Sequence, residues 1–294
     1  MTRLKIAIQK SGRLSDQSLE LLENCGIQFA RSKDKLFWYG RNLPVDLLLI
    51  RDDDIPRLLL DGVCDLGICG ENVARECLLD RQRSEAELTP EVALGFGFCR
   101  LCLALPETVS FDAVSSLDGR RIATSYPALT QEYLRAHAVS AEIVELSGAV
   151  EIAPSMGTAD AIVDLVSTGT TLRANQLREV ALVMESQAVL YSGTRRLDDD
   201  AGKLRALLIK RIVGILQARD SKYVMMHAPK AAVDAIADIL PGAESPTVLS
   251  LEGQPDKVAV HMLCTETVFW EHLEELKAMG ATAILVLPVE KMLT

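Results

Sequence analysis

A short loop rich in hydroxyl groups is the part of this sequence best suited to chemistry. It follows an apolar stretch at 160–166 and precedes a helical pattern that begins near Leu172; its residues are Ser167, Thr168, Gly169, Thr170 and Thr171. Backbone N–H groups at the positive end of a helix, together with side-chain hydroxyls, commonly bind phosphate. The loop therefore predicts a phosphate site, although an N-capped helix start accounts equally well for the same residues.

Asp164 precedes this loop and adds a carboxylate to it. A carboxylate at that position can hold a ribose diol or a magnesium ion, which favours a functional interpretation of the loop. No Gly-Lys-Ser or Gly-Lys-Thr sequence follows at the spacing of a Walker loop. The pattern therefore argues against that type of nucleotide site.

Basic and polar residues follow three other predicted strands, at 4–8, 45–50 and 64–68. These residues are Lys10, Ser11, Gly12, Arg13, Arg51, Gly70 and Asn72. Ligands of open α/β sheets bind at the carboxyl ends of the strands, so the residues should face one crevice. Each basic residue also fits a solvated surface position, and the aspartates at 52–54 are interpreted as a solvated helix start rather than a metal site.

Strands alternate with helices in the first part of the chain, which predicts a largely parallel sheet. Residues 119–190 repeat this pattern. The segment 62–68 matches 157–163 as Gly-x-small-Asp-apolar-x-aliphatic, and 5–7 resembles 121–123. These matches favour two related α/β lobes with a cleft between them.

The C-terminal part has a different order of elements. Residues 222–292 show the pattern strand, helix, strand, strand, helix, strand, which predicts a ferredoxin-like βαββαβ domain. An apolar stripe from Leu204 to Leu216 predicts a connecting helix ahead of it. The expected domains are a first lobe with its connector, a second lobe and the C-terminal domain: 1–102 with about 185–218, 103–184, and 219–294.

Composition and charge narrow the classes of function. The chain has 294 residues, of which 49% are hydrophobic and 24% charged, as in a folded globular protein. A formal net charge of −10 argues against general binding to nucleic acid or to an anionic membrane, and no apolar run is long enough to span one. The seven cysteines lie mostly in apolar runs, so we expect buried thiols in a cytosolic protein rather than disulfides. Cys99 and Cys102 are interpreted as packing residues rather than metal ligands.

Several motifs resemble those of the ATP phosphoribosyltransferase family, and together they extend over essentially the whole chain. They are Gln9–Leu14, Arg51–Pro56, Asp65–Ile68, Arg121–Pro127, 151–177 and Ser221–Pro229. The stretch Val166–Leu172 is the most specific of them. The sequence is most similar to the long form of the family, which carries its own C-terminal regulatory domain.

This resemblance implies a reaction, a fold and a form of regulation. The family transfers the 5-phosphoribosyl group of 5-phosphoribosyl 1-diphosphate to N1 of ATP and releases diphosphate, with Mg²⁺ as cofactor, in the first step of L-histidine biosynthesis. Its fold combines two α/β lobes of the type II periplasmic-binding-protein class with an ACT-like domain. The resemblance also implies a cytoplasmic homo-oligomer, dimer or hexamer, that is inhibited by histidine.

The resemblance also implies roles for the residues named above and adds Tyr126 and Glu151 at the reacting centre. The implied catalytic set is Lys10, Arg13, Arg51, Tyr126, Glu151 and Asp164. The set for phosphoribosyl diphosphate is Asp164 with 167–171, and the set for the nucleotide is Ser11, Gly12, Arg13, Gly70 and Asn72. Mg²⁺ would bind through the substrate diphosphate, with Asp164 as a candidate ligand. The implied histidine site comprises His227, Ser245, Thr247 and Ala283.

Two other classes of protein fit parts of the pattern. Prephenate dehydratase also joins two such lobes to a ferredoxin-like amino-acid sensor, but its Thr-Arg-Asp-Thr type of motif is absent from this sequence. A non-catalytic solute-binding or sensor protein could share the lobes, but no signal peptide or helix-turn-helix segment is visible. For the reaction itself we expect positioning and electrostatic stabilisation, without a covalent nucleophile.

Overall fold

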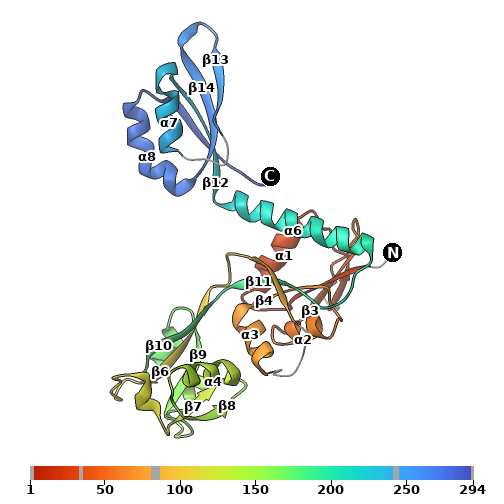
Figure 1. The fold of residues 1–294 in the computed structure, drawn as a ribbon, viewed down its shortest axis with the longest axis vertical. Coiled ribbons are helices and arrows are strands. Elements are labelled where there is room, and N and C mark those ends of the chain that lie inside the picture. The colour runs from red at the N-terminus through yellow and green to blue at the C-terminus, as the bar shows by residue number, and fades with distance from the viewer. Residues whose placement is uncertain (1–2, 33–35, 81–86, 241–244, 293–294) are drawn as a thin grey trace. The chain divides into compact units, whose positions relative to one another are not determined.

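The computed structural model describes four stretches of the chain: 3–32, 36–80, 87–240 and 245–292 (Figure 1). The chain forms two compact units, of which the first ends at Ala206 and the second begins at Leu207. All seven cysteines are buried, as predicted. Within the described part of the chain, no helix has both the length and the apolar character needed to cross a membrane.

The first sheet contains six strands: β1 Leu4–Gln9, β2 Phe37–Tyr39, β3 Val45–Ile50, β4 Leu66–Gly70, β5 Thr89–Ala93 and β11 Ala188–Ser192. Their order is β2-β3-β1-β4-β11-β5. β1 pairs in parallel with β3 and β4, whereas β11 is antiparallel to β4 and β5. Every residue of β4 is buried, as expected for a central strand that is covered on both faces.

Three helices connect these strands: α1 Ser15–Asn24, α2 Asp54–Leu60 and α3 Glu71–Asp80. Asp53 is the N-cap of α2, which confirms the predicted helix start. α2 packs closely on β4, because a Cβ atom at Gly67 would lie 2.7 Å from Ile55 Cγ2 and 2.9 Å from Leu59 Cδ1. Glycine at this position therefore lets the helix approach the strand. We call the first sheet and these helices the first lobe.

The second sheet contains five strands: β6 Cys99–Pro106, β7 Arg121–Thr124, β8 Glu142–Glu145, β9 Ala161–Val166 and β10 Leu177–Ser186. Their order is β10-β6-β9-β7-β8. The connections include two α-helices and two 3₁₀-helices: α4 Pro127–Ala136, α5 Thr170–Ala174, η1 Val114–Leu117 and η2 Val150–Ile152. We call this sheet and its helices the second lobe. The predicted lobe boundaries at 102 and 184 lie inside β6 and β10, which both belong to this sheet.

The strands at the two ends of the second lobe connect it to the first. β6 begins at Cys99 and β10 ends at Ser186, and these two residues are register partners. β11 follows β10 and lies between β4 and β5. The second lobe is thus an insertion into the first, whose sheet is completed by a strand from beyond the insertion.

The sequence repeat has the same structural role in both lobes. Asp65 Oδ2 accepts a hydrogen bond from the backbone N–H of Lys5 at 2.7 Å, and Asp160 Oδ2 accepts one from the N–H of Arg121 at 2.9 Å. In return, the N–H of each aspartate donates to the carbonyl of the same strand residue. Arg195 Nη1 also lies 3.4 Å from Asp65 Oδ1. An aspartate therefore holds the amino end of the first strand of each repeat, which supports the prediction of two related lobes.

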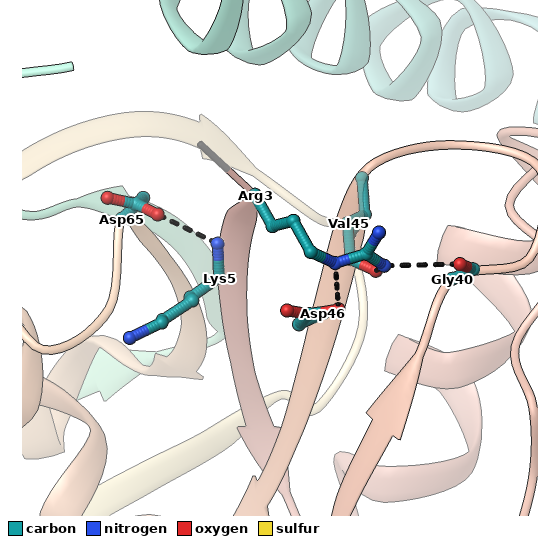
Figure 2. Close-up of polar contacts among 6 residues, drawn as sticks. All are labelled: Arg3, Lys5, Gly40, Val45, Asp46 and Asp65. Atoms are coloured by element: carbon teal, nitrogen blue, oxygen red, sulfur yellow. Dashed lines mark hydrogen bonds and ion pairs between the residues drawn. The ribbon is translucent and has the colours of Figure 1, made fainter. Parts of the chain in front are cut away.

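A second carboxylate stabilises the same edge of the first sheet (Figure 2). Arg3 Nε donates to Asp46 Oδ1 at 2.7 Å. The Nη2 of this arginine donates to the carbonyls of Gly40 and Val45 at 3.1 and 3.0 Å. Asp46 is buried, so its charge needs this cationic partner. The amino ends of the strands are thus an edge of paired charges.

The helix α6 Asp199–Arg219 precedes the C-terminal sheet. The following elements are β12 Ser221–Pro229, η3 Lys230–Ala232, α7 Val233–Ile239, β13 Thr247–Leu251, β14 Gln254–Thr265, α8 Glu266–Ala278 and β15 Thr282–Pro288. The strand order is β13-β14-β12-β15, and every pair is antiparallel. Alternate residues of β12 are buried against α7 and α8, which cover one face of the sheet (Figure 1). The predicted fold class, two α/β lobes of the periplasmic-binding-protein type and a ferredoxin-like C-terminal domain, is confirmed.

Candidate active site

Predicted site residues of the two lobes meet where the strands end. Arg13, in the segment after β1, donates from Nη1 to Ser167 Oγ in the loop after β9, at 2.9 Å. Asn72, in the first turn of α3, donates from Nδ2 to the hydroxyl oxygen of Tyr126 at 3.0 Å. Tyr126 is the residue before α4. The carboxyl ends of β1, β4, β7 and β9 therefore surround one region between the lobes.

The hydroxyl-rich loop lies between β9 and α5. α5 begins at Thr170, two residues before the predicted start, and ends at Ala174. Gly169 precedes it with a φ of 71°, a left-handed conformation that suits glycine. The four hydroxyl residues are exposed, and Oγ1 of Thr168 and of Thr170 lie 3.0 Å apart. The loop thus presents its hydroxyl groups to a ligand from one short turn.

Charged side chains that the sequence analysis did not single out surround this loop. Arg173 Nη2 donates to the Thr168 carbonyl at 3.2 Å. A Cβ atom at Gly169 would lie 3.2 Å from Arg173 Nη1 and 3.4 Å from Glu179 Oε1. Glu179 in turn forms an ion pair with Arg100 at 3.1 Å. Arg173 of α5 therefore holds the loop in place, and beside Arg173 and Glu179 the glycine leaves little space for a larger residue.

Asp164, on β9 just before the loop, is half-buried. Burial raises the pKa of its carboxyl group, the N–H of Leu165 lowers it through a 2.8 Å hydrogen bond, and the charge of Glu151 raises it again. Glu151 lies in η2, which follows Ala149 in a left-handed conformation with φ 51°. Glu151 is thus near enough for its charge to influence the ionisation of Asp164.

Tyr126 is half-buried, and its hydroxyl is bonded to Asn72. Burial raises the pKa of the phenol well above its usual value, and the charges of Asp53, Asp52 and Asp164 add to that effect. These carboxylates come from both lobes. The phenol therefore stays neutral and keeps its proton available as a hydrogen-bond donor.

Asn72 connects Tyr126 to the strand that leaves the second lobe. Its backbone N–H donates to Ser186 Oγ at 3.1 Å, and Ser186 Oγ donates to Asn72 Oδ1 at 2.7 Å. Asn72 and Ser186 are both buried. Gly70 is required beside them, because a Cβ atom there would collide with Asn72 Oδ1. The predicted nucleotide residues Gly70 and Asn72 therefore belong to a buried network rather than to an open loop.

The sequence predicts a solvated helix start at 52–54, but Asp52 is half-buried. Its Oδ1 atom is buried and has no hydrogen-bond partner among the described residues. Burial and the charge of Asp53 raise its pKa to about 6, while the N–H of Gly70 and the charge of Arg13 oppose the rise. Its burial depends on segments that are distant in sequence, so the run of three aspartates gave no sign of it.

The remaining predicted cationic residues are exposed. Lys10, Ser11 and Gly12 follow β1, and Arg51 follows β3. The N–H of Lys10 donates to the carbonyl of Ile50 at 2.7 Å, which places the two strand ends side by side. Lys10 and Arg51 thus carry positive charge at adjacent strand ends, where an anionic ligand can reach them.

A cavity of about 380 Å³ opens beside Tyr126. Both lobes contribute to its wall, with acids and hydroxyl groups on it: Asp53, Glu76, Ser125, Tyr126, Glu145 and Ser147. Among the described residues, no three His, Cys, Asp or Glu side chains are grouped so that they could hold a metal ion alone. Mg²⁺ is commonly held by one or two carboxylates together with substrate phosphates, and Asp164 beside the hydroxyl loop fits such a shared site.

The four residues predicted to bind histidine are divided between the two halves of the C-terminal sheet. His227 on β12 is the register partner of Thr282, which adjoins Ala283 on β15. Thr247 lies on β13 at the opposite edge, and Ser245 precedes it. One copy of the domain therefore places His227 beside the strand that holds Ala283, while β14 separates it from the strand that holds Thr247. A cavity of about 730 Å³ in this domain includes Ala283 in its wall.

Comparison with known protein families and structures gives two kinds of match. The family model for ATP phosphoribosyltransferase, HisG, matches residues 51–217, and the model for the HisG C-terminal domain matches residues 218–291. A solved structure of the ATP phosphoribosyl transferase (HisG:HisZ) complex from Thermotoga maritima is 28% identical, with a TM-score of 0.59. That match covers 71% of this chain and 98% of the Thermotoga chain. The alkanesulfonate-binding protein SsuA from Xanthomonas axonopodis pv. citri, bound to MOPS, is 16% identical with a TM-score of 0.46, covering 81% of this chain and 79% of SsuA.

Proposed function

Because the chain belongs to the ATP phosphoribosyltransferase family of histidine biosynthesis, we propose that it transfers the 5-phosphoribosyl group of 5-phosphoribosyl 1-diphosphate to N1 of ATP and releases diphosphate. The observation that carries this proposal is the contact between Arg13 of the first lobe and Ser167 of the second. It puts a cationic group of one lobe on the phosphate loop of the other. A reaction between two anionic substrates needs a cationic group close to where both are bound, so that they are held side by side.

The phosphoribosyl substrate binds on the second lobe in this proposal. The hydroxyls of 167–171 and the N–H groups of the loop hold its 5-phosphate, and Asp164 holds the ribose diol. Asp164 would also hold Mg²⁺ together with the diphosphate, and the ion would supply charge neutralisation for the leaving group. Glu151 and Tyr126 line the reacting carbon, where positive charge develops as the diphosphate departs.

ATP binds against the first lobe. Ser11, Gly12 and Arg13 form the turn after β1, and a φ of 112° at Gly12 gives that turn a conformation suited to glycine. Lys10, Arg13 and Arg51 screen the triphosphate, while the buried Gly70 and Asn72 shape the nucleotide site from the end of β4. These cations are needed because the acids of the cleft would otherwise repel both substrates.

One measurement tests the reaction. Diphosphate release should require ATP, phosphoribosyl diphosphate and Mg²⁺ together, and the phosphoribosyl group should be recovered on ATP. Arg13→Met should lower kcat/KM at least about tenfold, since hydrogen bonds to charged groups are among the strongest. Arg31→Met is the matched control, because Arg31 pairs with Glu23 in the same lobe. Diphosphate release without ATP, or equal losses in both variants, would contradict the proposal.

We also propose that the C-terminal domain binds histidine and inhibits the reaction in a cytoplasmic homo-oligomer, dimer or hexamer. In the strand order β14 separates His227 on β12 from Thr247 on β13, and a site between neighbouring copies of the domain would combine residues from both parts of the sheet. Thr247→Ala and His227→Ala should weaken inhibition and leave turnover without histidine near normal. Unaltered inhibition in both variants would show that the effector site lies elsewhere.

A further inference from the structure

Glu76 on α3 makes two hydrogen bonds across the lobes. Its Oε1 accepts from the backbone N–H of Ala128 and its Oε2 from the N–H of Leu129, each at 2.8 Å. Both N–H groups belong to the first turn of α4. One carboxylate of the first lobe therefore binds a helix start of the second lobe through both of its oxygens.

α4 needs this acceptor because its own sequence lacks one. Tyr126 is its N-cap residue and makes no side-chain cap hydrogen bond. Pro127 follows and has no N–H to satisfy, so the amides of Ala128 and Leu129 are the first two that need partners. A carboxylate is the preferred partner at the positive end of a helix.

The same face of α3 also holds Tyr126. Asn72 precedes Glu76 by four residues, and side chains with that spacing lie on one face of a helix. Asn72 bonds the Tyr126 hydroxyl at 3.0 Å, while Glu76 bonds the two amides that follow Pro127. α3 thus holds the segment 126–129 through hydrogen bonds to the side chain of Tyr126 and to the backbone of Ala128 and Leu129.

We propose that Glu76 is a positioning residue that aims Tyr126 into the cleft. It acts through the backbone of α4 and does not touch the substrates. Glu76 lies in the wall of the 380 Å³ cavity beside Tyr126, so a shift of the turn would change the shape of that cavity. The catalytic part of this inference rests on the reaction proposed above, whereas the contact between Glu76 and α4 does not.

Other acids surround Glu76, so its ionised form is stabilised mainly by the two amides of α4. Burial raises the pKa of its carboxyl group, the N–H groups of Leu129 and Ala128 lower it, and the charges of Asp80 and Glu145 raise it. A carboxylate among other acids is stable there only while it accepts these hydrogen bonds. The same interaction therefore stabilises the ionised acid and the start of the helix.

A second contact between α3 and α4 provides a matched control. Arg75 and Glu132 form an ion pair at 2.6 Å, with side chains that are 50% and 44% exposed. Exposed ion pairs contribute little to stability, so Glu132→Gln should leave both structure and turnover almost unchanged. This variant removes a charge from the same pair of helices without touching the turn at Tyr126.

The experiment compares Glu76→Gln, Glu76→Ala and Glu132→Gln in the full chain. Amide exchange at Ala128 and Leu129 should become about tenfold faster or more in both Glu76 variants, and kcat should fall about tenfold or more while KM for phosphoribosyl diphosphate changes little. The Glu132 variant should match the wild type in both measurements. Unchanged exchange in the Glu76 variants would overturn the contact, whether or not the chain has the proposed activity.

A double-mutant cycle with Tyr126→Phe distinguishes positioning from general stabilisation. If Glu76 acts through Tyr126, Glu76→Gln should reduce kcat much less in the background of the Tyr126→Phe variant than in the wild type. Additive losses, or a Tyr126→Phe variant with normal kcat, would overturn the positioning role. A wild-type protein without phosphoribosyl transfer would refute the proposed function, and the exchange measurement would still judge the contact of Glu76 with α4.

Discussion

Two aspartates at the two ends of β9 have opposite properties. Asp160 precedes the strand, and its pKa is lowered, mainly because the N–H of Arg121 donates to its carboxylate. Asp164 lies near the other end, and burial raises its pKa. The first acid is paired with the backbone of its own lobe, while the second is left near Glu151 beside the loop proposed to bind phosphate. A single strand thus separates a charge that maintains the fold from one that is available for a ligand.

The first lobe shows the same contrast. Asp65, at the amino edge of the sheet, is buried and bonded to the N–H of Lys5, with Arg195 nearby. Both aspartates have a buried Oδ1 without a hydrogen-bond partner among the described residues, but Arg195 Nη1 lies 3.4 Å from that atom of Asp65, whereas burial and the charge of Asp53 raise the pKa of Asp52 at the carboxyl edge. Unsatisfied charge costs stability and is kept where a ligand can satisfy it. The comparison predicts that substitutions at the two edges will change stability in opposite directions.

The largest expected effect on stability is at the amino edge of the sheet, where Asp65 is paired. Asp65→Ala should lower the free energy of unfolding by about 3 to 5 kcal/mol, because it removes one partner of a buried pair and leaves the N–H of Lys5 unsatisfied. Chemical denaturation of the full chain measures this loss. Asp160→Ala should lower the free energy of unfolding by a smaller amount, since the Asp160 side chain is 34% exposed. A loss at Asp65 no greater than at Asp160 would contradict the comparison.

At the cleft edge, Asp52→Asn should raise stability and lower activity. The folded pKa of about 6 is above the reference value of 3.8, so folding favours the protonated acid. Stability contributed by this acid is present below pH 4 and lost as the pH rises through about 6, and the difference amounts to about 3 kcal/mol. The variant should therefore unfold at higher denaturant than the wild type at pH 8 and gain little at pH 4. Asp53→Asn, at its exposed neighbour, is the control and should show a smaller gain.

Variants of the phosphate loop should change activity rather than stability. Asp164→Ala and Thr171→Ala should each lower kcat/KM for phosphoribosyl diphosphate by an amount worth about 1.5 to 3 kcal/mol, the value of a hydrogen bond to a charged group. Steady-state kinetics with each substrate varied in turn measures the loss. If kcat/KM for that substrate is normal in both folded variants, the assignment of the loop is wrong.

The smallest expected effect on chemistry is at the cysteines of β6. Burial, followed by the charge of Glu179, raises the pKa of the Cys102 thiol to about 12, so it is neither a nucleophile nor a ready metal ligand. A Cys99→Ser and Cys102→Ser double variant should keep its turnover, also after a wash with chelator followed by Mg²⁺. An inactive double variant that is still folded would show that these thiols take part in the reaction.

Local patterns were sufficient to predict the repeat and the hydroxyl loop. The aspartate of each Gly-x-small-Asp segment bonds the strand whose sequence also repeats, so both halves of the interaction are visible in the residues. The loop was recognisable because its hydroxyl groups are adjacent in sequence. α5 begins two residues before its predicted start, because Gly169 adopts a left-handed conformation directly before Thr170.

Contacts between the lobes could not be predicted in the same way. The residues around Glu76 do not show that the amides of α4 face it, and the run of aspartates does not show that Asp52 is buried. A partial signal was present on α3, where Asn72 and Glu76 share one face with the buried Val73 and Cys77. Polar residues on a buried face indicate a partner, but only the fold identifies which one.

The position of β11 has a consequence for the synthesis of this protein on the ribosome. β5 leaves the ribosome before the second lobe, yet its pairing partner in the sheet is β11, which emerges after it. The strands of the second lobe end at Ser186, so that lobe can close while the first still lacks a central strand. We therefore expect a nascent chain to complete the inserted lobe first, with β4 and β5 waiting for residues 188–192 to join them.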